Sequence, residues 1–484
     1  MKNTLICLNK SDWLRWFSVV VLGALTLSAC APGTATPTVM TESPVIETET
    51  IIPTEAETPA PDVTPVQETP VHLQVEPEDL AGIVVRMVHP WVGEMAETLS
   101  SLASQFSLSN EWDIWVEVDA PGSDSAVLDA VEADMADEEI PSLIVSYPYA
   151  MDTLDETYYS VNLRDYLNDP TWGLDDAAQA DVPAVLLSQY ERAGNLAALP
   201  LAPQGTVIFY NQTWAQELGF AEPPNGNAEA FRQQSCEAAF SNNADDSFEN
   251  DGTGGWLVSF DPLVMTGWYA SFDGPLAGED ALKFDSPPGQ DAFGYLKSVY
   301  DEGCFWIGRR TEPYYYFANR YAMSYAGTLD QIPAQAGWMT TSGSQDAWSV
   351  IGFPGPAGET MLVNGPGMMI TADTPEIQMA AWLFARYLLS PEAQAQLVRA
   401  GFSLPVRQSA MAQLSDFSAT YPQWAQAAAL LDTAQAAPIS ARWGIGQYVL
   451  QDAVNRLLQA EPDQVGPILT ELDASISELE GTTP

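Results

Sequence analysis

Few residues in this chain could carry out acid–base or nucleophilic chemistry. His89 is the one histidine in residues 81–484, and the sequence holds no G-x-S-x-G, P-loop or H-E-x-x-H pattern. Two carboxylates that flank a glycosidic bond can hydrolyse it, but no spacing among the 65 acidic residues singles out a pair. The sequence therefore predicts that the protein is not an enzyme, with a carbohydrate-active enzyme as an alternative.

Aromatic residues offer a different chemistry, and the chain has 15 Trp, 18 Tyr and 17 Phe. A flat aromatic ring packs against the C–H surface of a sugar or polyol, while planar polar groups bind its hydroxyls. Trp91 and Tyr147 each follow an apolar segment at a place where a strand should end. They are candidate ligand contacts, although any one Trp in so Trp-rich a chain also suits a core.

Cys30 is placed for covalent modification. A basic start is followed by the apolar run from Trp16 to Ala29, which closes on the small residues before Cys30. This is the pattern of a secretory signal, and Leu27-Ser28-Ala29-Cys30 resembles a bacterial lipobox, whose thiol is diacylated. We expect residues 1–29 to be a signal peptide and Cys30 to anchor the protein in the cell membrane, outside the cytoplasm. The alternative is a chance cysteine after an ordinary signal peptide.

The remaining cysteines of the mature chain are Cys236 and Cys304. Two cysteines in an oxidising compartment favour a disulfide, with two buried free thiols as the alternative. No C-x-x-C pair exists, so no metal site is expected. The stretch 245–252 hints at a calcium loop, but Trp256 stands where an EF-hand carries its last Glu. A solvated acidic loop is the preferred interpretation.

Residues 31–80 have the composition of a tether. They contain nine Pro, ten Thr and ten acidic residues, with no Lys, Arg, Phe, Trp or Tyr. Such a segment buries too little apolar surface to offset its conformational entropy. We predict a disordered linker over residues 30–80, which reaches roughly 40 Å when coiled and about 150 Å when extended.

Charge narrows the possible partners of the body, residues 81–484. It has 14 Lys or Arg against 54 Asp or Glu. Nucleic acids and anionic lipid headgroups would be repelled by this excess. We therefore expect no nucleic-acid partner, and contact with the membrane through the lipid anchor alone.

The candidate contacts must be held by strands and helices, and these alternate along the first part of the body. The pattern predicts strands over 82–88, 114–118 and 141–145, with amphipathic helices over 93–107 and 125–136. Alternation of this kind points to an α/β fold with parallel strands and right-handed crossovers. Ligands bind beyond the carboxyl ends of such strands, where Trp91 and Tyr147 lie.

Together these features resemble the extracellular solute-binding proteins of ABC importers, the class that includes maltose-binding and other sugar-binding proteins. The resemblance covers about residues 81–479. It rests on the order of the lipoprotein signal and tether, the strand ending in His89-Pro90-Trp91, and the segments 114–118, 140–145, 199–201, 207–214, 317–323, 381–384, 389–394 and 404–407.

The resemblance implies two α/β lobes joined by hinge strands, with the ligand cleft between them. It places residues 81–203 and 350–404 in lobe 1, and residues 204–349 and 405–484 in lobe 2. It also implies a monomer that captures a small solute, most simply a sugar, and delivers it to ABC transporter permease subunits without a cofactor. A glycan-adhesion lipoprotein is a further alternative.

More candidate ligand contacts come from the same resemblance. The segment from Asp261 to Trp268 is similar to one that places an acid and an aromatic residue in the family's site, and Trp443 is similar to a late aromatic contact. Thr328 follows an expected strand over 321–325, and Gly365 stands where a small residue lets the backbone approach a ligand.

The anchor assignment gives a first prediction. Cys30→Ala removes the thiol that takes the lipid, so the variant should be released into the medium or remain unprocessed. Cell fractionation with mass spectrometry of the N-terminus measures this, with the wild-type chain as the control. A variant that is still cleaved and still membrane-bound would contradict the assignment.

Overall fold

The computed structural model describes residues 73–136, 140–150, 154, 160–192, 194–224, 226–278, 280–310, 312–356, 358–371, 373–439 and 441–480. The chain divides into two units, Met1–Val66 and Gln67–Pro484, and every element named below belongs to the second. The predicted signal peptide, Cys30 and the tether as far as residue 72 lie outside the described residues. Across the described ranges, no helix combines the length and apolar character needed to cross a membrane.

The folded body begins by Leu73, whereas the sequence analysis extended the tether to residue 80. Leu73, Val75 and Leu80 are buried in the core of lobe 1, with 5, 8 and 0% of their surfaces exposed. A short 3-10 helix, η2 (Pro77–Leu80), carries Leu80 into this core. The polar average composition of the tether hid these three apolar residues at its end.

Lobe 1 is built on a five-stranded sheet in the order β2-β1-β3-β15-β6. Its strands are β1 (Val84–Val88), β2 (Trp115–Asp119), β3 (Leu143–Ser146), β6 (Leu199–Pro200) and β15 (Gly367–Ile370). β1, β2 and β3 are parallel, as the alternating pattern predicts, while β15 runs antiparallel to β3 and β6. The carboxyl ends of the parallel strands therefore meet at one edge of the sheet.

Helices cover this sheet through apolar stripes. α1 (Gly93–Ser109) buries Met95, Leu99, Leu102, Ala103 and Phe106, which recur at helical spacing. The other elements of lobe 1 are α2 (Asp124–Ala136), α4 (Leu163–Asn168), α5 (Asp176–Ala180), α6 (Ala184–Leu187), η3 (Ser188–Tyr190), β4 (Glu191–Arg192), β5 (Asn195–Leu196), α13 (Pro375–Leu388) and α14 (Pro391–Gly401). α13 comes late in the chain, yet it joins early residues: the Trp382 indole N–H donates to the Trp172 carbonyl at 2.8 Å.

Lobe 2 has its own sheet, in the order β16-β14-β7-β10-β8-β9, with β11 also paired to β7. The strands are β7 (Gln204–Asn211), β8 (Trp256–Leu257), β9 (Phe305–Trp306), β10 (Ser324–Thr328), β11 (Trp348–Ile351), β14 (Leu362–Asn364) and β16 (Gln435–Ala436), beside a hairpin of β12 (Phe353–Gly355) and β13 (Gly358–Thr360). β8, β9 and β10 are parallel to one another. Their carboxyl ends, at Leu257, Trp306 and Thr328, form a second edge where strands end together.

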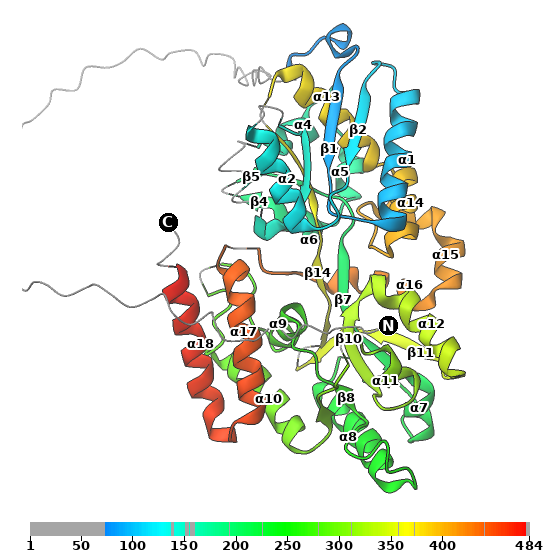
Figure 1. Ribbon diagram of the computed structural model, residues 1–484, viewed down its shortest axis with the longest axis vertical. Coiled ribbons are helices and arrows are strands. Elements are labelled where there is room, and N and C mark those ends of the chain that lie inside the picture. Colours follow the sequence, from blue (N-terminus) through cyan, green and yellow to red (C-terminus); the bar gives the residue numbers. More distant parts are fainter. Residues whose placement is uncertain are drawn as a thin grey trace, which may run out of the picture. The chain divides into compact units, whose positions relative to one another are not determined.

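The helices of lobe 2 come from three parts of the chain. They are α7 (Gln212–Glu217), α8 (Ala228–Ala244), α9 (Pro262–Ser271), α10 (Pro287–Asp301), α11 (Tyr314–Ala318), η4 (Leu329–Gln331), α12 (Ile332–Ser342), η5 (Gln408–Gln413), α15 (Ser415–Thr420), α16 (Pro422–Ala429), η6 (Leu430–Thr433), α17 (Ala441–Gln459), η7 (Pro462–Gln464) and α18 (Val465–Glu480). Leu457 and Ile468 of the last two α-helices are buried in the same core as Val299 of α10. Figure 1 shows α17 and α18 beside α10, in agreement with the expected packing of the C-terminal helices.

Three chain segments lie side by side where the chain passes between the sheets. Asn364 of β14 pairs with Gln204 of β7, and Figure 1 shows these two strands running together. The Leu404 N–H donates to the Pro203 carbonyl at 2.7 Å. A Cβ on Gly365 would lie 2.7 Å from the Cα of Pro203, so the packing of these segments requires glycine there.

The return of the chain to lobe 1 comes later than the sequence analysis placed it. The boundary at residue 350 assumed a crossing near Trp348–Phe353. In the structure β11 and β14 pair with β7 in the lobe 2 sheet, and the chain first joins the lobe 1 sheet at Gly367. Residues 350–364 therefore belong with lobe 2. Apolar strands of similar length on both sides of the crossing gave no signal of where it occurs.

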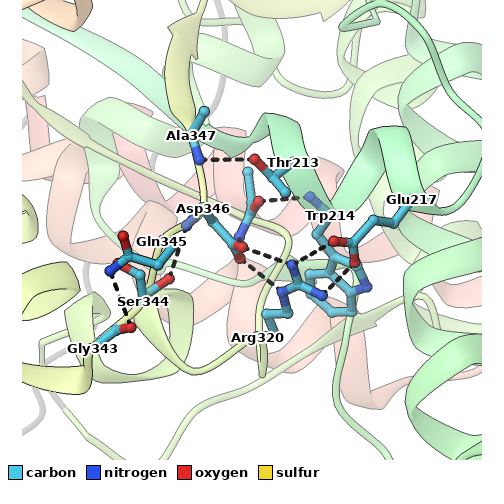
Figure 2. A network of polar contacts seen from close by, with 10 residues as sticks. Thr213, Trp214, Glu217, Arg320, Gly343, Ser344, Gln345, Asp346 and Ala347 are labelled. Carbon is cyan, nitrogen blue, oxygen red and sulfur yellow. Dashed lines mark hydrogen bonds and ion pairs between the residues drawn. The ribbon is translucent and has the colours of Figure 1, made fainter.

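A polar network holds part of lobe 2 together. The Arg320 guanidinium donates to both carboxylate oxygens of Asp346, each at 2.7 Å, and to Glu217 at 2.6 Å. Asn211 donates to Asp346 at 2.8 Å and accepts from the Trp214 N–H, which caps α7. Burial alone would raise the pKa of Asp346, but these hydrogen bonds and the charge of Arg320 lower it. Figure 2 shows Arg320 between the two carboxylates, so Asn211 and Arg320, both within segments that carry the family resemblance, have a structural role here.

The structure contains the predicted disulfide. Cys236 of α8 and Cys304, which directly precedes β9, are joined with an Sγ–Sγ distance of 2.00 Å. The bond connects two elements of lobe 2 across a sequence separation of 68 residues. Closing a loop of this length restricts the unfolded chain, and the chain-entropy account assigns such a loop roughly 4 kcal/mol of stability.

We expect the double variant Cys236→Ala/Cys304→Ala to lose about 4 kcal/mol of unfolding free energy, because its unfolded state regains that freedom. Urea unfolding followed by tryptophan fluorescence measures the loss, and wild type treated with a reductant is the matched control. An unchanged midpoint in both samples would contradict a stabilising disulfide.

Candidate functional site

The carboxyl ends of the parallel strands in lobe 2 surround a cavity of about 480 Å³. Its wall contains residues 257–261 at and after the end of β8, residues 307, 308 and 310 after β9, and residues 325–328 of β10. Gln331 of η4 and Gln451 of α17 line it as well, together with Thr206, Leu263, Val264 and Pro313. This is the position where ligands bind on sheets of this kind.

Asp261 and Thr328, two of the predicted contacts, both line this cavity. Asp261 caps α9, since its Oδ1 accepts from the N–H groups of Leu263 and Val264 at 2.8 and 3.3 Å. Thr328 is the last residue of β10, which ends three residues beyond the expected strand over 321–325. Its hydroxyl donates to Asp330 at 2.5 Å. The structure thus brings these two predicted residues together.

Tyr147 occupies the corresponding edge of lobe 1, directly after β3. Its ring stacks on that of Tyr149, with centroids 5.8 Å apart and planes 16° from parallel. Asp124, at the start of α2, accepts from the Tyr149 hydroxyl at 2.9 Å and from the Ser146 hydroxyl at 2.8 Å. These bonds fix an aromatic pair at the carboxyl end of the parallel strands.

Tyr147 and Tyr149 both have ionisable groups of lobe 2 near them. Burial raises the pKa of Tyr147 to about 12, with smaller contributions from the charges of Asp124 and Asp330. Burial also raises the pKa of Tyr149, and the charge of Asp124, its hydrogen bond to Asp124 and, to a smaller extent, Tyr147 and Tyr448 of α17 act in the same direction. Asp330 and Tyr448 belong to lobe 2, so both tyrosines lie within electrostatic range of the opposite lobe. Each stays a neutral hydrogen-bonding group at physiological pH.

Trp91 lies partly buried at the end of β1, against the core of lobe 1. Its backbone N–H donates to His89 Nδ1 at 3.2 Å, and the ring centroids of Trp91 and His89 are 5.7 Å apart. Burial lowers the pKa of His89 to about 4 although Asp119 acts in the opposite direction, so this imidazole is neutral near pH 7. His89 is fully buried and supports the turn that carries Trp91.

Trp268 and Trp443 are not brought to the cavity. Trp268 has no exposed surface, and five aromatic rings surround it at centroid distances of 5.3–6.5 Å, those of Phe231, Trp256, Tyr295, Phe305 and Phe353. Trp443 is 3% exposed and belongs to the same core. Gly365 lies at the crossing of the lobes, where its carbonyl accepts from the Tyr190 hydroxyl at 2.8 Å. The structure gives these three residues packing roles.

Several cavity residues escaped the sequence analysis. Arg310 lines the cavity, with its guanidinium 4.2 Å from the ring centre of Tyr315. Tyr325 and Gln331 line it as well, on either side of the predicted Thr328. The sequence did carry a signal for Arg310, because Arg309 and Arg310 are two adjacent basic residues in a very acidic chain. Tyr325 had none, because aromatic residues recur throughout the core strands.

Two other features of the described residues offer no second site. A surface hollow of about 550 Å³ lies between α10 and α18, lined by Lys297 and Asp301 among others, away from both sets of strand ends. Cys236, Glu302 and Cys304 come close enough together to suggest a metal site. Their two sulfur atoms are already joined in the disulfide, so they are not available as thiolate ligands.

Comparison with known proteins identifies the kind of molecule that carries this arrangement. A family profile described as bacterial extracellular solute-binding protein matches residues 102–429. A comparison with curated protein sequences found no match.

Solved structures share the fold at low sequence identity. The cyclic α-maltosyl-1,6-maltose binding protein of Arthrobacter globiformis has a TM-score of 0.68 and 16% identity, covering 81% of this chain and 98% of its own. The sugar-binding protein MalE of Xanthomonas citri has a TM-score of 0.68 and 18% identity, covering 82% and 98%. UgpB of Mycobacterium tuberculosis, solved with glycerophosphocholine, has a TM-score of 0.64 and 16% identity, covering 82% and 98%. The predicted two-lobed α/β fold is confirmed.

The burial of Trp268 leads to a prediction about stability. Trp268→Ala should lower the unfolding free energy by about 3–5 kcal/mol, because it leaves a cavity among five rings. Phe248→Ala is the control, since Phe248 is 87% exposed and its loss should change stability by about 0.5 kcal/mol or less. Urea unfolding measures both. A Trp268→Ala variant of wild-type stability but weakened solute binding would return Trp268 to the ligand site.

Proposed function

This chain belongs to the family of bacterial extracellular solute-binding proteins, and we propose that it is a lipid-anchored receptor for a small solute, first of all a sugar. In this proposal it acts as a monomer outside the cytoplasm and delivers the solute to the permease of an ABC importer. The lipobox-like sequence before Cys30 supports the anchor. Similar folds in a cyclic α-maltosyl-1,6-maltose binding protein and in a sugar-binding protein support the choice of solute.

The observation that carries the proposal is a pair of strand-end edges on different lobes, each of which presents candidate ligand contacts. The cavity at the strand ends of lobe 2 presents Asp261 and Thr328. The strand ends of lobe 1 present Tyr147, which lies within electrostatic range of Asp330 in lobe 2. A solute that contacts both edges favours the form of the protein in which the lobes are close, as in a hinge-bending receptor.

A phosphate-bearing solute is the second candidate. It is favoured by Arg310, whose guanidinium lines the cavity and contacts the Tyr315 ring, with no carboxylate partner recorded among the described residues. Asp261 lines the same cavity and opposes an anion. Glycerophosphocholine is the probe for this candidate, because UgpB was solved with it.

An enzyme and a glycan-adhesion module remain alternatives to be tested. Incubation with maltotriose or mannotriose separates the three classes. Product formation would indicate an enzyme. Binding without a change in particle size would indicate an adhesion module. Reversible binding with compaction is what we expect of the receptor.

Isothermal titration and small-angle scattering of the soluble Cys30→Ala chain test the proposal. We expect saturating sugar to reduce the radius of gyration of the wild type. Trp91→Ala and Tyr147→Ala should each weaken binding about 5- to 150-fold, because each removes an aromatic face.

Trp115→Ala is the matched control for these variants. Trp115 is 50% exposed and lies at the amino end of β2, at the opposite edge of the lobe 1 sheet from Trp91. The Trp115→Ala variant should bind the sugar with the affinity of the wild type. An unchanged radius of gyration at saturating sugar would contradict a receptor that closes on its ligand. Unaltered affinity in both Trp91→Ala and Tyr147→Ala would mean that these two aromatic residues pack in the core and do not contact the ligand.

A further inference from the structure

Two polar atoms in the wall of the lobe 2 cavity lack a hydrogen-bond partner. The Tyr325 hydroxyl and the Gln331 Oε1 are both buried, and no group in the described part of the chain bonds to either. Both residues line the cavity, and Tyr325 is 1% exposed. Buried polar atoms in native proteins nearly always have partners, because leaving them unpaired is costly.

The protein holds both groups in place. The Tyr325 ring stacks on Phe209 with centroids 4.5 Å apart and meets Phe317 edge-on at 5.4 Å, which fixes the direction of its hydroxyl. Gln331 extends from η4 over Gly327. A Cβ on Gly327 would lie 2.2 Å from Gln331 Oε1, so only glycine leaves room for the carboxamide in this position. Tyr325 and Gly327 are two residues apart on β10, so their side-chain positions lie on the same face of the strand. The carboxamide of Gln331, which covers Gly327, therefore lies on the same face as the Tyr325 side chain.

We propose that the Tyr325 hydroxyl and Gln331 Oε1 form a hydroxyl-binding subsite of the solute cleft, with Gly327 as the residue that positions Gln331. The inference rests on the proposed function and narrows its ligand. A solute hydroxyl accepts a hydrogen bond from Tyr325 and donates one to Gln331. An ionised phosphate or carboxylate accepts from Tyr325 but has no proton for Gln331 Oε1, and it pairs with Gln331 only if the carboxamide turns to present its NH2 group. The subsite as it stands therefore matches a solute hydroxyl, which can accept and donate at once.

Two substitutions test the subsite by different routes. Gln331→Met removes the acceptor and keeps the length of the side chain. It should weaken binding of the tightest ligand among maltose, maltotriose and mannotriose by about 5- to 150-fold. Gly327→Ala should weaken binding to a similar degree, because its Cβ displaces the carboxamide. The displaced group is the free end of a flexible side chain, so the melting temperature should stay close to that of the wild type.

The double variant separates positioning from a general disturbance. If Gly327 acts through Gln331, the variant that carries both changes binds no more weakly than Gln331→Met alone. Gly337→Ala in α12 is the control, since its Cβ would meet nothing within 4 Å, and it should bind like the wild type. Wild-type affinity in both single variants would overturn the subsite while the receptor function stands.

If none of the three sugars binds, that result counts against the proposed sugar ligand. The subsite can then still be tested with a crystal soaked in glycerol. Glycerol supplies the same hydroxyl chemistry without the rest of a sugar. A glycerol hydroxyl within hydrogen-bond distance of Tyr325 Oη and Gln331 Oε1 supports the subsite. Glycerol bound elsewhere, or an absence of glycerol from both atoms, overturns it.

Discussion

The close packing of three chain segments between the two sheets is the constraint on which the rest of the structure depends. Pro203, Gly365 and Leu404 come from distant parts of the sequence, and they approach so closely that a side chain at position 365 would collide with Pro203. Each lobe is therefore assembled from separate stretches of chain. The two sets of strand ends, one with Tyr147 and the other with Thr328, stand on the two lobes that these segments connect.

The sequence was most informative where a local pattern determines the outcome. Alternating apolar segments gave β1, β2 and β3 with their helices, and the five buried residues of α1 follow from 3.6-residue periodicity. The crossing before β15 was placed too early, because β11 and β14 are as apolar as the strands of lobe 1. Which lobe a strand joins is decided by its pairing partners, and pairing across hundreds of residues leaves no local trace.

The candidate site shows the same contrast between local sequence patterns, which could be predicted, and long-range contacts, which could not. Position at a strand end was enough to place Tyr147 and Thr328 at the carboxyl edges of the two sheets, since the geometry of parallel sheets dictates where such residues lie. Resemblance to a family segment was a poor guide to Trp268, which shares its chemistry with a sugar-stacking tryptophan but is buried among five aromatic rings. Gln331 was overlooked because the subsite proposed for it depends on the missing side chain of Gly327 and on an oxygen that has no hydrogen-bond partner among the described residues, both of which are properties of the fold.

The late position of α13 and β15 has a consequence for biogenesis. The Tyr166 hydroxyl donates to Gln378, 212 residues further along the chain, and β15 lies between β3 and β6 in the lobe 1 sheet. The core of lobe 1 cannot close until more than three quarters of the polypeptide has been synthesised. Contacts of such high sequence separation slow folding. The first half of the chain therefore lacks partners of its own core while the second half is still being made.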